Sequence, residues 1–83
     1  MAKRENFIVK MNGVEVAVKH AWNSAVRETE WQIGEVANNA GCEYRLTSHS
    51  SVKEGFYFTS GVRVWEGQDG QTVRFTIEKE CNK

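Results

Sequence analysis

The sequence predicts an α+β domain in which an antiparallel sheet carries one helix on one face, in the element order ββαβββ. One long stretch repeats its apolar residues at helical spacing, several shorter stretches alternate apolar and polar residues, and the 83 residues include no proline. A chain of this length has room for one small core. We therefore expect residues 1–83 to form a single domain, with frayed ends at 1–5 and 80–83.

The helix is expected over Trp22–Ala40, where one stripe is apolar throughout. Either Asn23 or Ser24 supplies the side-chain oxygen that caps its first turn, and Gly41 offers the left-handed residue that ends it. The stretch 29–33 also alternates as a short strand would. The residues of the stripe are Trp22, Val26, Thr29, Ile33, Val36 and Ala40.

A hairpin precedes this helix. Asn12-Gly13 is a strong signal for a two-residue type I′ turn, because both residues accept a positive φ. The turn would place one apolar band inward and set Lys10 opposite Glu15 on the outer face. The other expected pairs are Met11 with Val14, Val9 with Val16, Phe7 with Val18 and Ile8 with Ala17.

Three strands are expected after the helix. The third begins at Cys42 and ends before a polar loop at Thr47–Ser51, and the fourth begins at Gly55. At Ser60-Gly61 the fourth strand either continues past a bulge or turns back, and continuity is favoured. Continuity places Phe56, Phe58, Val62 and Val64 on one face. A turn at Gly67–Gly70 leads to the last strand, whose inward residues are Val73, Phe75 and Ile77.

Composition argues against several functions. Eleven basic and eleven acidic residues give a formal net charge of zero, so no charge excess indicates nucleic acid or an anionic membrane. No apolar run has the length of a membrane span and no signal peptide is evident, so we expect a cytoplasmic protein. Cys42, Cys81, His20 and His49 have no zinc or catalytic spacing. We therefore expect no enzyme activity, no cofactor and no metal.

The outer face of the C-terminal sheet is one candidate binding site. A four-residue turn would set Arg63 opposite Arg74 and place Trp65 and Tyr57 on the same face. Two arginines facing each other favour an anion between them, such as a nucleic-acid phosphate or a nucleotide. The alternative is structural: Trp65 covers the arginine stems, or stacks on Arg74 if the turn is shorter.

The exposed side of the helix is the other candidate site. Trp31 falls nearly opposite the apolar stripe, on the same side as Arg27, Glu28 and Glu35. Tryptophan and arginine often dominate protein interfaces, because one such side chain buries a large area. Alternatively, Trp31 covers Gly34 or lies under the loop at 48–51.

From these patterns we expect a small, non-catalytic protein-binding module that inhibits or modulates a larger partner by occlusion. Small inhibitors encoded by phages have this outline, so a phage accessory protein fits the pattern. The alternative function is binding of nucleic acid or a nucleotide-like anion through Tyr57, Arg63, Trp65 and Arg74. A homodimer is a third expectation, since no proline protects either edge of the sheet.

Overall fold

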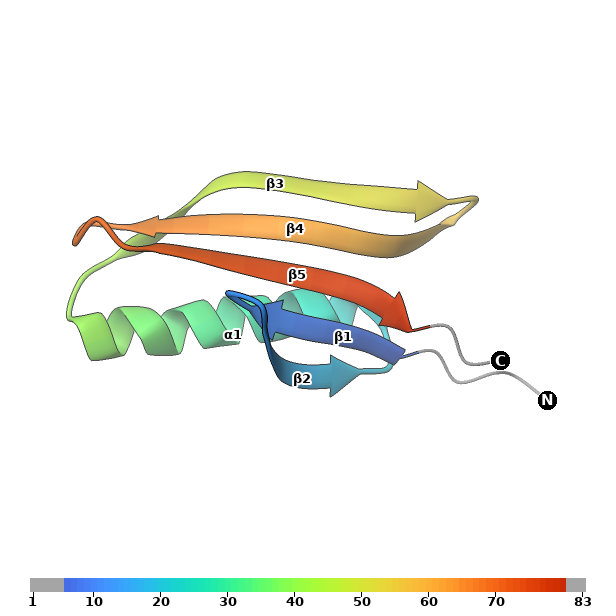
Figure 1. Cartoon of the computed structure of the whole chain (residues 1–83), viewed down its shortest axis with the longest axis horizontal. Coiled ribbons are helices and arrows are strands. Elements are labelled where there is room, and N and C mark those ends of the chain that lie inside the picture. Colours follow the sequence, from blue (N-terminus) through green and yellow to red (C-terminus); the bar gives the residue numbers. More distant parts are fainter. Residues whose placement is uncertain (1–5, 81–83) are drawn as a thin grey trace.

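The computed structural model describes residues 6–80. It shows a five-stranded antiparallel sheet with one helix on one face (Figure 1). The observed element order is ββαβββ, so the predicted fold class is confirmed. In space the strands lie in the order β2-β1-β5-β4-β3. The elements are β1 (Asn6–Met11), β2 (Val14–Lys19), α1 (Trp22–Ala40), β3 (Tyr44–Glu54), β4 (Tyr57–Gly67) and β5 (Thr72–Glu80).

The helix begins and ends where the apolar pattern predicted. Its N-cap is Ala21, which makes no side-chain hydrogen bond, so the expected capping by Asn23 or Ser24 is wrong. Gly41 has φ 70° and its N–H donates to the Ala37 carbonyl, as expected of a left-handed C-cap. The stripe is buried at Thr29 and Ile33 and half-buried at Trp22, Val26 and Val36, whereas Ala40 at its end is exposed.

The core lies between α1 and the half of the sheet made by β1, β2 and β5. We call the sheet face toward α1 the inner face and the opposite one the outer face. The inward residues predicted for the last strand are confirmed as buried. In the core, Thr29 of α1 is fully buried, and its hydroxyl donates to the Val26 carbonyl over 2.6 Å. The remaining buried apolar residues are Phe7, Val9, Ala25, Ile33, Val73, Phe75 and Ile77.

The first hairpin has the predicted turn but only part of the predicted register. Met11 pairs with Val14 and Lys10 with Glu15, as expected. Beyond them a register shift pairs Val9 with Ala17, so the expected pairs Val9 with Val16, Phe7 with Val18 and Ile8 with Ala17 are wrong. The shift leaves Val16 unpaired, as a β-bulge does, and β2 bends as it runs past α1 (Figure 1).

Asn12 joins this hairpin to β5. Its φ is 52°, its N–H donates to the Arg74 carbonyl over 2.7 Å, and its Oδ1 accepts the Arg74 N–H over 3.0 Å. The side chain thus takes the place of a backbone carbonyl after β1 has ended. This arrangement continues the pairing of β1 with β5 by one step.

The β3–β4 hairpin is longer than predicted. Residues 47–51, expected to form a loop, belong to β3, and the turn lies at Gly55 and Phe56, where a fourth strand was expected to begin. The third strand begins at Tyr44, not at Cys42. The fourth strand continues through Ser60 and Gly61, as favoured. The register shifts leave Thr47 and Thr59 unpaired, so the bulge is not at Gly61.

The turn between β4 and β5 decides which residues of β4 face the helix. The Gly67 N–H donates to the Gln71 carbonyl, which closes a loop of residues 68–70 in which Gly70 has φ 84°. The predicted four-residue turn was one residue too long. A shift of one residue exchanges the two faces of a strand. Consequently Arg63 pairs with Phe75 and Trp65 with Val73 on the inner face, while Val62 and Val64 face outward.

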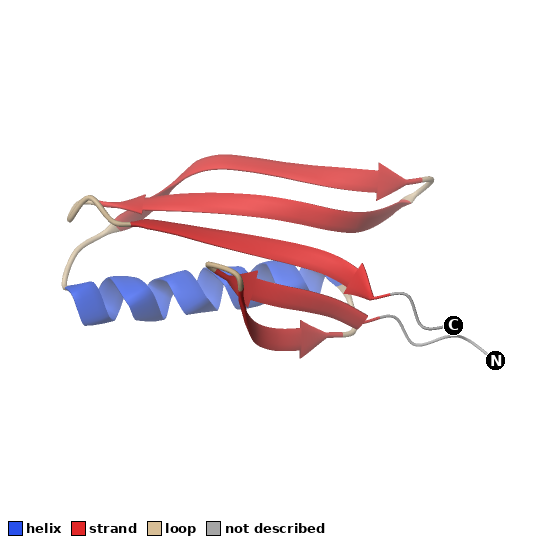
Figure 2. Cartoon of the chain, in the orientation of Figure 1, coloured by secondary structure: helices blue, strands red, loops and turns tan. Residues whose placement is uncertain are grey.

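The sheet extends beyond the helix. Figure 2 shows the β3–β4 hairpin continuing along one side of the sheet, with the helix under the other side. The edge strands are β2 and β3. Glu80, expected in the frayed tail, pairs with Asn6, whereas 1–5 and 81–83 lie outside the described residues. Within residues 6–80, no helix is both long enough and apolar enough to cross a bilayer.

Candidate protein-interaction surface

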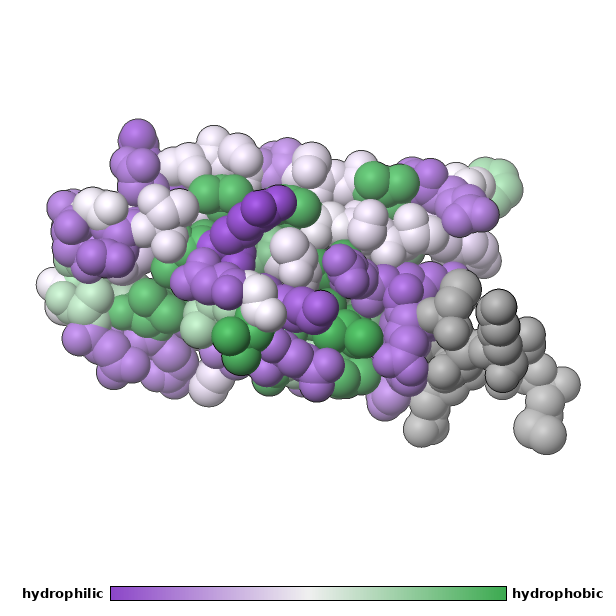
Figure 3. Space-filling view, in the orientation of Figure 1, coloured by the Kyte–Doolittle hydropathy of each residue, from purple (hydrophilic) through white to green (hydrophobic). Residues whose placement is uncertain are grey.

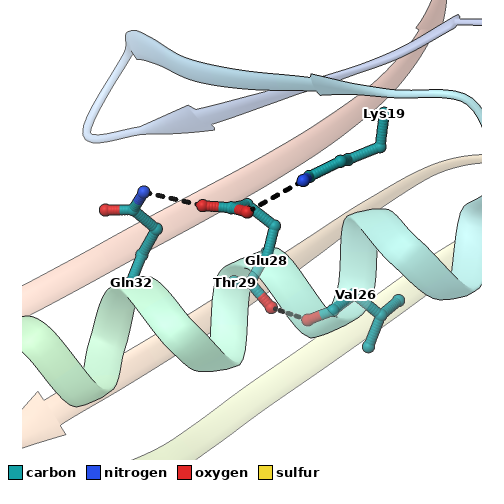
Figure 4. Close-up of polar contacts among 5 residues, drawn as sticks. All are labelled: Lys19, Val26, Glu28, Thr29 and Gln32. Carbon is teal, nitrogen blue, oxygen red and sulfur yellow. Dashed lines mark hydrogen bonds and ion pairs between the residues drawn. The ribbon is translucent and has the colours of Figure 1, made fainter.

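The predicted helix patch is only partly a free surface. Trp31 is 60% exposed, and Arg27 and Glu35 are also exposed. Glu28 lies differently: its carboxylate is 3.3 Å from Lys19 Nζ and accepts a 2.8 Å hydrogen bond from Gln32 Nε2 (Figure 4). Glu28 therefore ties α1 to β2, and its expected place on the solvated side of the helix is wrong. Trp31, Arg27 and Glu35 remain as the exposed part of this patch.

The four residues of the predicted sheet patch are separated by the observed register. Arg63 and Trp65 lie on the inner face, whereas Arg74 pairs with Val64 and points outward. The expected pairing of Arg63 with Arg74 is therefore wrong. Tyr57 lies next to the hairpin turn, at the start of β4. Trp65 is partly buried against the core and its indole N–H has no hydrogen-bond partner among the described residues.

The turn of the β3–β4 hairpin carries the most exposed aromatic side chain of the described residues. Phe56 is 91% exposed and Tyr57 is 71% exposed. Val52, close to the turn on β3, is 57% exposed. We call these three residues the hairpin tip. Phe56 was expected within the fourth strand, on the same face as Phe58, but Gly55 with φ 67° reverses the chain and places Phe56 in the turn.

A stack of two aromatic rings supports the hairpin tip. Trp22, at the start of α1, stacks on Phe58 of β4 with ring centroids 4.9 Å apart and an interplanar angle of 18°. Phe7 of β1 meets the edge of Trp22 at 5.9 Å, and Lys53 Nζ lies 5.0 Å from the centre of the Phe58 ring. The first turn of α1 is thereby fixed to β4 directly behind the hairpin tip.

Two hollows lie on either side of this stack. The first, of about 310 Å³, is lined by Phe56 and Tyr57 on one side and by the β2–α1 connection, including His20, on the other. The second, of about 130 Å³, is lined by Arg63 and His49. Both hollows include Trp22 and Phe58 in their walls. The stack therefore separates two adjoining hollows, one beside Phe56 and Tyr57 and the other beside Arg63 on the inner face.

A third hollow, of about 460 Å³, lies at the other end of the sheet, where Tyr44 and Asp69 form a structural contact. The Tyr44 hydroxyl is 3.2 Å from both carboxylate oxygens of Asp69, which also accepts the Gln71 N–H over 3.0 Å. Partial burial raises the pKa of the Tyr44 phenol, and the hydrogen bond to Asp69 and its negative charge raise this pKa further. Asp69 therefore holds the β4–β5 turn against β3.

Among residues 6–80 no group of histidine, cysteine and acidic side chains is arranged to bind a metal ion. Cys42 is a partly buried free thiol, and Cys81 lies outside the described residues. On the side of the molecule seen in Figure 3, hydrophobic residues are scattered in small groups among polar ones. The exposed aromatic residues Phe56 and Tyr57 differ from these scattered groups because they lie together at the turn of the β3–β4 hairpin.

Sequence reasoning missed the hairpin tip because it read the polar residues 47–51 as a loop. One signal was available in the sequence: Gly55 directly follows two charged residues. A glycine in that position, preceded by Lys53-Glu54, indicates a hairpin turn. The signal was hidden because the aromatic run at 56–58 has the composition of a buried strand.

No protein-family model, no curated protein sequence and no solved structure matches this chain.

Proposed function

We propose that this chain is a non-catalytic protein-binding module whose contact surface is the hairpin tip. The observation that carries the proposal is the exposure of Phe56 and Tyr57 side by side at the end of the sheet. Exposed aromatic groups at the edge of a small domain are typical of interaction sites, since each ring buries a large area when a partner covers it.

The fold itself gives Phe56 no role. Its ring does not stack on another aromatic side chain among the described residues. A turn position of this kind is usually occupied by a polar residue or glycine. Covering a side chain of this size yields about 1.5–3 kcal/mol. A partner would therefore gain free energy from Phe56 that the isolated chain does not use.

The support behind the hairpin tip favours a preorganised contact. Trp22 and Phe58 hold the base of the hairpin against α1, so the aromatic residues are presented by a packed element and not by a flexible loop. A binding site that is ordered before association loses less conformational entropy on binding. This is the property expected of an inhibitor or modulator that acts by covering a site on a larger protein.

Trp31 supplies a second contact surface in this proposal. It is exposed near the middle of α1, whereas the hairpin tip lies beside the first residue of that helix. One partner contact at the hairpin tip and another at Trp31 would allow the chain to bridge two proteins. A homodimer through the open edge strand β3 is compatible with either contact, and analytical ultracentrifugation of the purified chain tests it.

The experiment compares proteins captured from a lysate by the wild-type chain and by the double variant Phe56→Ser, Tyr57→Ser, at low and moderate salt. Val14→Ser is the matched control, because Val14 is 65% exposed and lies in the other hairpin. We expect a stoichiometric protein that resists salt, is lost with the double variant and is retained by the control. Retention of every captured protein by the double variant would contradict the proposal. Nucleic acid captured only at low salt would favour the alternative function.

A further inference from the structure

The inner faces of β3 and β4 form a strip beside the helix, exposed over most of β3 and half-buried over most of β4, and its charges all have one sign. His49 pairs with Arg63 and Lys53 with Phe58, so the three basic side chains share this face. The acidic residues of the same two strands, Glu54 and Glu66, occupy alternate positions and face outward. The strip is therefore positively charged, although the chain as a whole is neutral.

Arg63 has no counter-ion in this strip. Its side chain is half-buried between Phe75 on the neighbouring strand and His49 on the other side. Among the described residues Arg63 forms no hydrogen bond and no ion pair. Glu30 is the exposed acidic residue on the same flank of α1 as Val26, and it forms no ion pair with Arg63. A charge partly removed from water is costly unless a group of opposite sign compensates it.

The hollow beside Arg63 has the size of one side chain. Its volume is about 130 Å³, and Trp22 and Phe58 close it on the side of the hairpin tip. Pockets that hold nucleotides and other small molecules usually have volumes of roughly 300–1,000 Å³. The hollow therefore suits a single carboxylate side chain better than a nucleotide.

The shape of the strip indicates what carries that carboxylate. Two neighbouring strands with their side chains span about 10 Å, which is close to the diameter of one α-helix. α1 already packs on the other half of the same sheet face. A second helix would fit beside α1, with apolar contacts to Leu46 and Trp65, which pair on this face.

We propose that an acidic amphipathic helix of a protein partner lies on the inner faces of β3 and β4 and places one carboxylate between Arg63 and His49. This inference rests on the proposed protein-binding function and names the chemistry of its partner. The hairpin tip lies at one end of the strip and adds contacts beyond the helix. The carboxylate supplies the counter-ion that Arg63 lacks within the fold.

The test titrates the isotope-labelled full chain with a synthetic helical peptide in which glutamates flank a leucine stripe, and with the same peptide carrying glutamine at those positions. We expect the glutamate peptide to bind about tenfold more tightly, with backbone shifts centred on His49 and Arg63. Arg63→Gln should remove the difference between the two peptides, and Arg63→Lys should keep most of it. Arg74→Gln, on the outer face, is the matched control and should change nothing.

Equal affinities for the two peptides, or shifts centred on the outer face, would overturn the inference. A single-stranded oligonucleotide that displaces the glutamate peptide from Arg63 at equal concentration would also overturn it, in favour of nucleic acid. The proposed function is tested separately: a captured partner that depends on Phe56 but not on Arg63 leaves that function standing and removes this inference. Circular dichroism of each variant confirms that it is folded.

Discussion

Trp22 and Phe58 are the contact through which the helix holds the far half of the sheet. Their rings stack at 4.9 Å, whereas the helix otherwise packs mainly against β1, β2 and β5. Trp22 is the first residue of α1 and Phe58 the second of β4, so the stack joins the start of the helix to the base of the β3–β4 hairpin. The position of the hairpin tip therefore depends on this pair.

Replacing Trp22 should destabilise the fold strongly. Trp22→Ala removes the stack with Phe58 and the edge contact with Phe7, and we expect the free energy of unfolding to fall by about 2–4 kcal/mol in urea denaturation. Trp31→Ala, on the exposed side of the same helix, should change it by less than about 0.5 kcal/mol. Similar losses for both variants would show that the stack is not what anchors the helix.

Two glycines should respond to alanine in opposite directions. A Cβ at Gly61 would lie 2.7 Å from Trp22 Cη2 and 3.1 Å from the Ser50 carbonyl, so Gly61→Ala must displace the indole. We expect a loss of about 1–3 kcal/mol in the free energy of unfolding.

A Cβ added at Gly34, inside α1, would meet no atom within 4 Å apart from the surrounding backbone of the helix itself. Gly34→Ala should therefore stabilise the chain by about 0.5–1 kcal/mol through helix propensity. Thermal unfolding of the two variants beside the wild type measures both effects. A neutral Gly61→Ala would mean that Trp22 moves freely.

Alkaline pH should weaken the fold through Tyr44. Its pKa is raised in the folded chain, so its neutral form is favoured there. The contribution to stability is complete below the unfolded-state value of about 10 and is lost as the pH rises through the higher folded-state pKa. Absorbance titration in a Tyr57→Phe background, where Tyr44 is the sole tyrosine, measures this pKa. Asp69→Asn should lower it, and an unchanged value would exclude Asp69 as a cause.

Asn12 should be sensitive for two reasons that variants can separate. Asn12→Gly keeps the backbone conformation at φ 52° but loses the Oδ1 acceptor for Arg74, which we expect to cost about 1 kcal/mol. Asn12→Ala loses the acceptor and also places a Cβ in the left-handed region, which adds about 1–2 kcal/mol. Equal effects of the two variants in urea denaturation would show that the backbone conformation contributes nothing.

The errors of prediction come from turns and bulges. The alternation in β5 predicted Val73, Phe75 and Ile77 as inward residues correctly, because a strand pattern is local. The face of β4 was predicted wrongly, because it depends on whether the loop after Gly67 has three residues or four. This single residue moved Arg63 and Trp65 from the outer face to the inner one.

The candidate site was predictable only in part. Trp31 was placed on the exposed side of α1 from helical spacing alone, and it is exposed. Glu28 shares that side by spacing, but its contact with Lys19 depends on the register shift in the first hairpin, which pairs Lys19 with the buried Phe7. The exposure of Phe56 depends on where β3 turns, which the polar sequence of residues 47–51 does not reveal.

Local patterns were sufficient for the element order and for the helix Trp22–Ala40, because apolar periodicity and the glycine at its end are properties of neighbouring residues. Three features were determined only by the pairing of strands in the folded sheet: the register of β4, the residues that face the strip beside α1, and the exposure of the hairpin tip. These features depend on pairing between residues distant in sequence, where one unpaired residue at Thr47 or Thr59 changes which face a side chain occupies. The periodicity of a strand defines two faces, and only its neighbours determine which of them is buried.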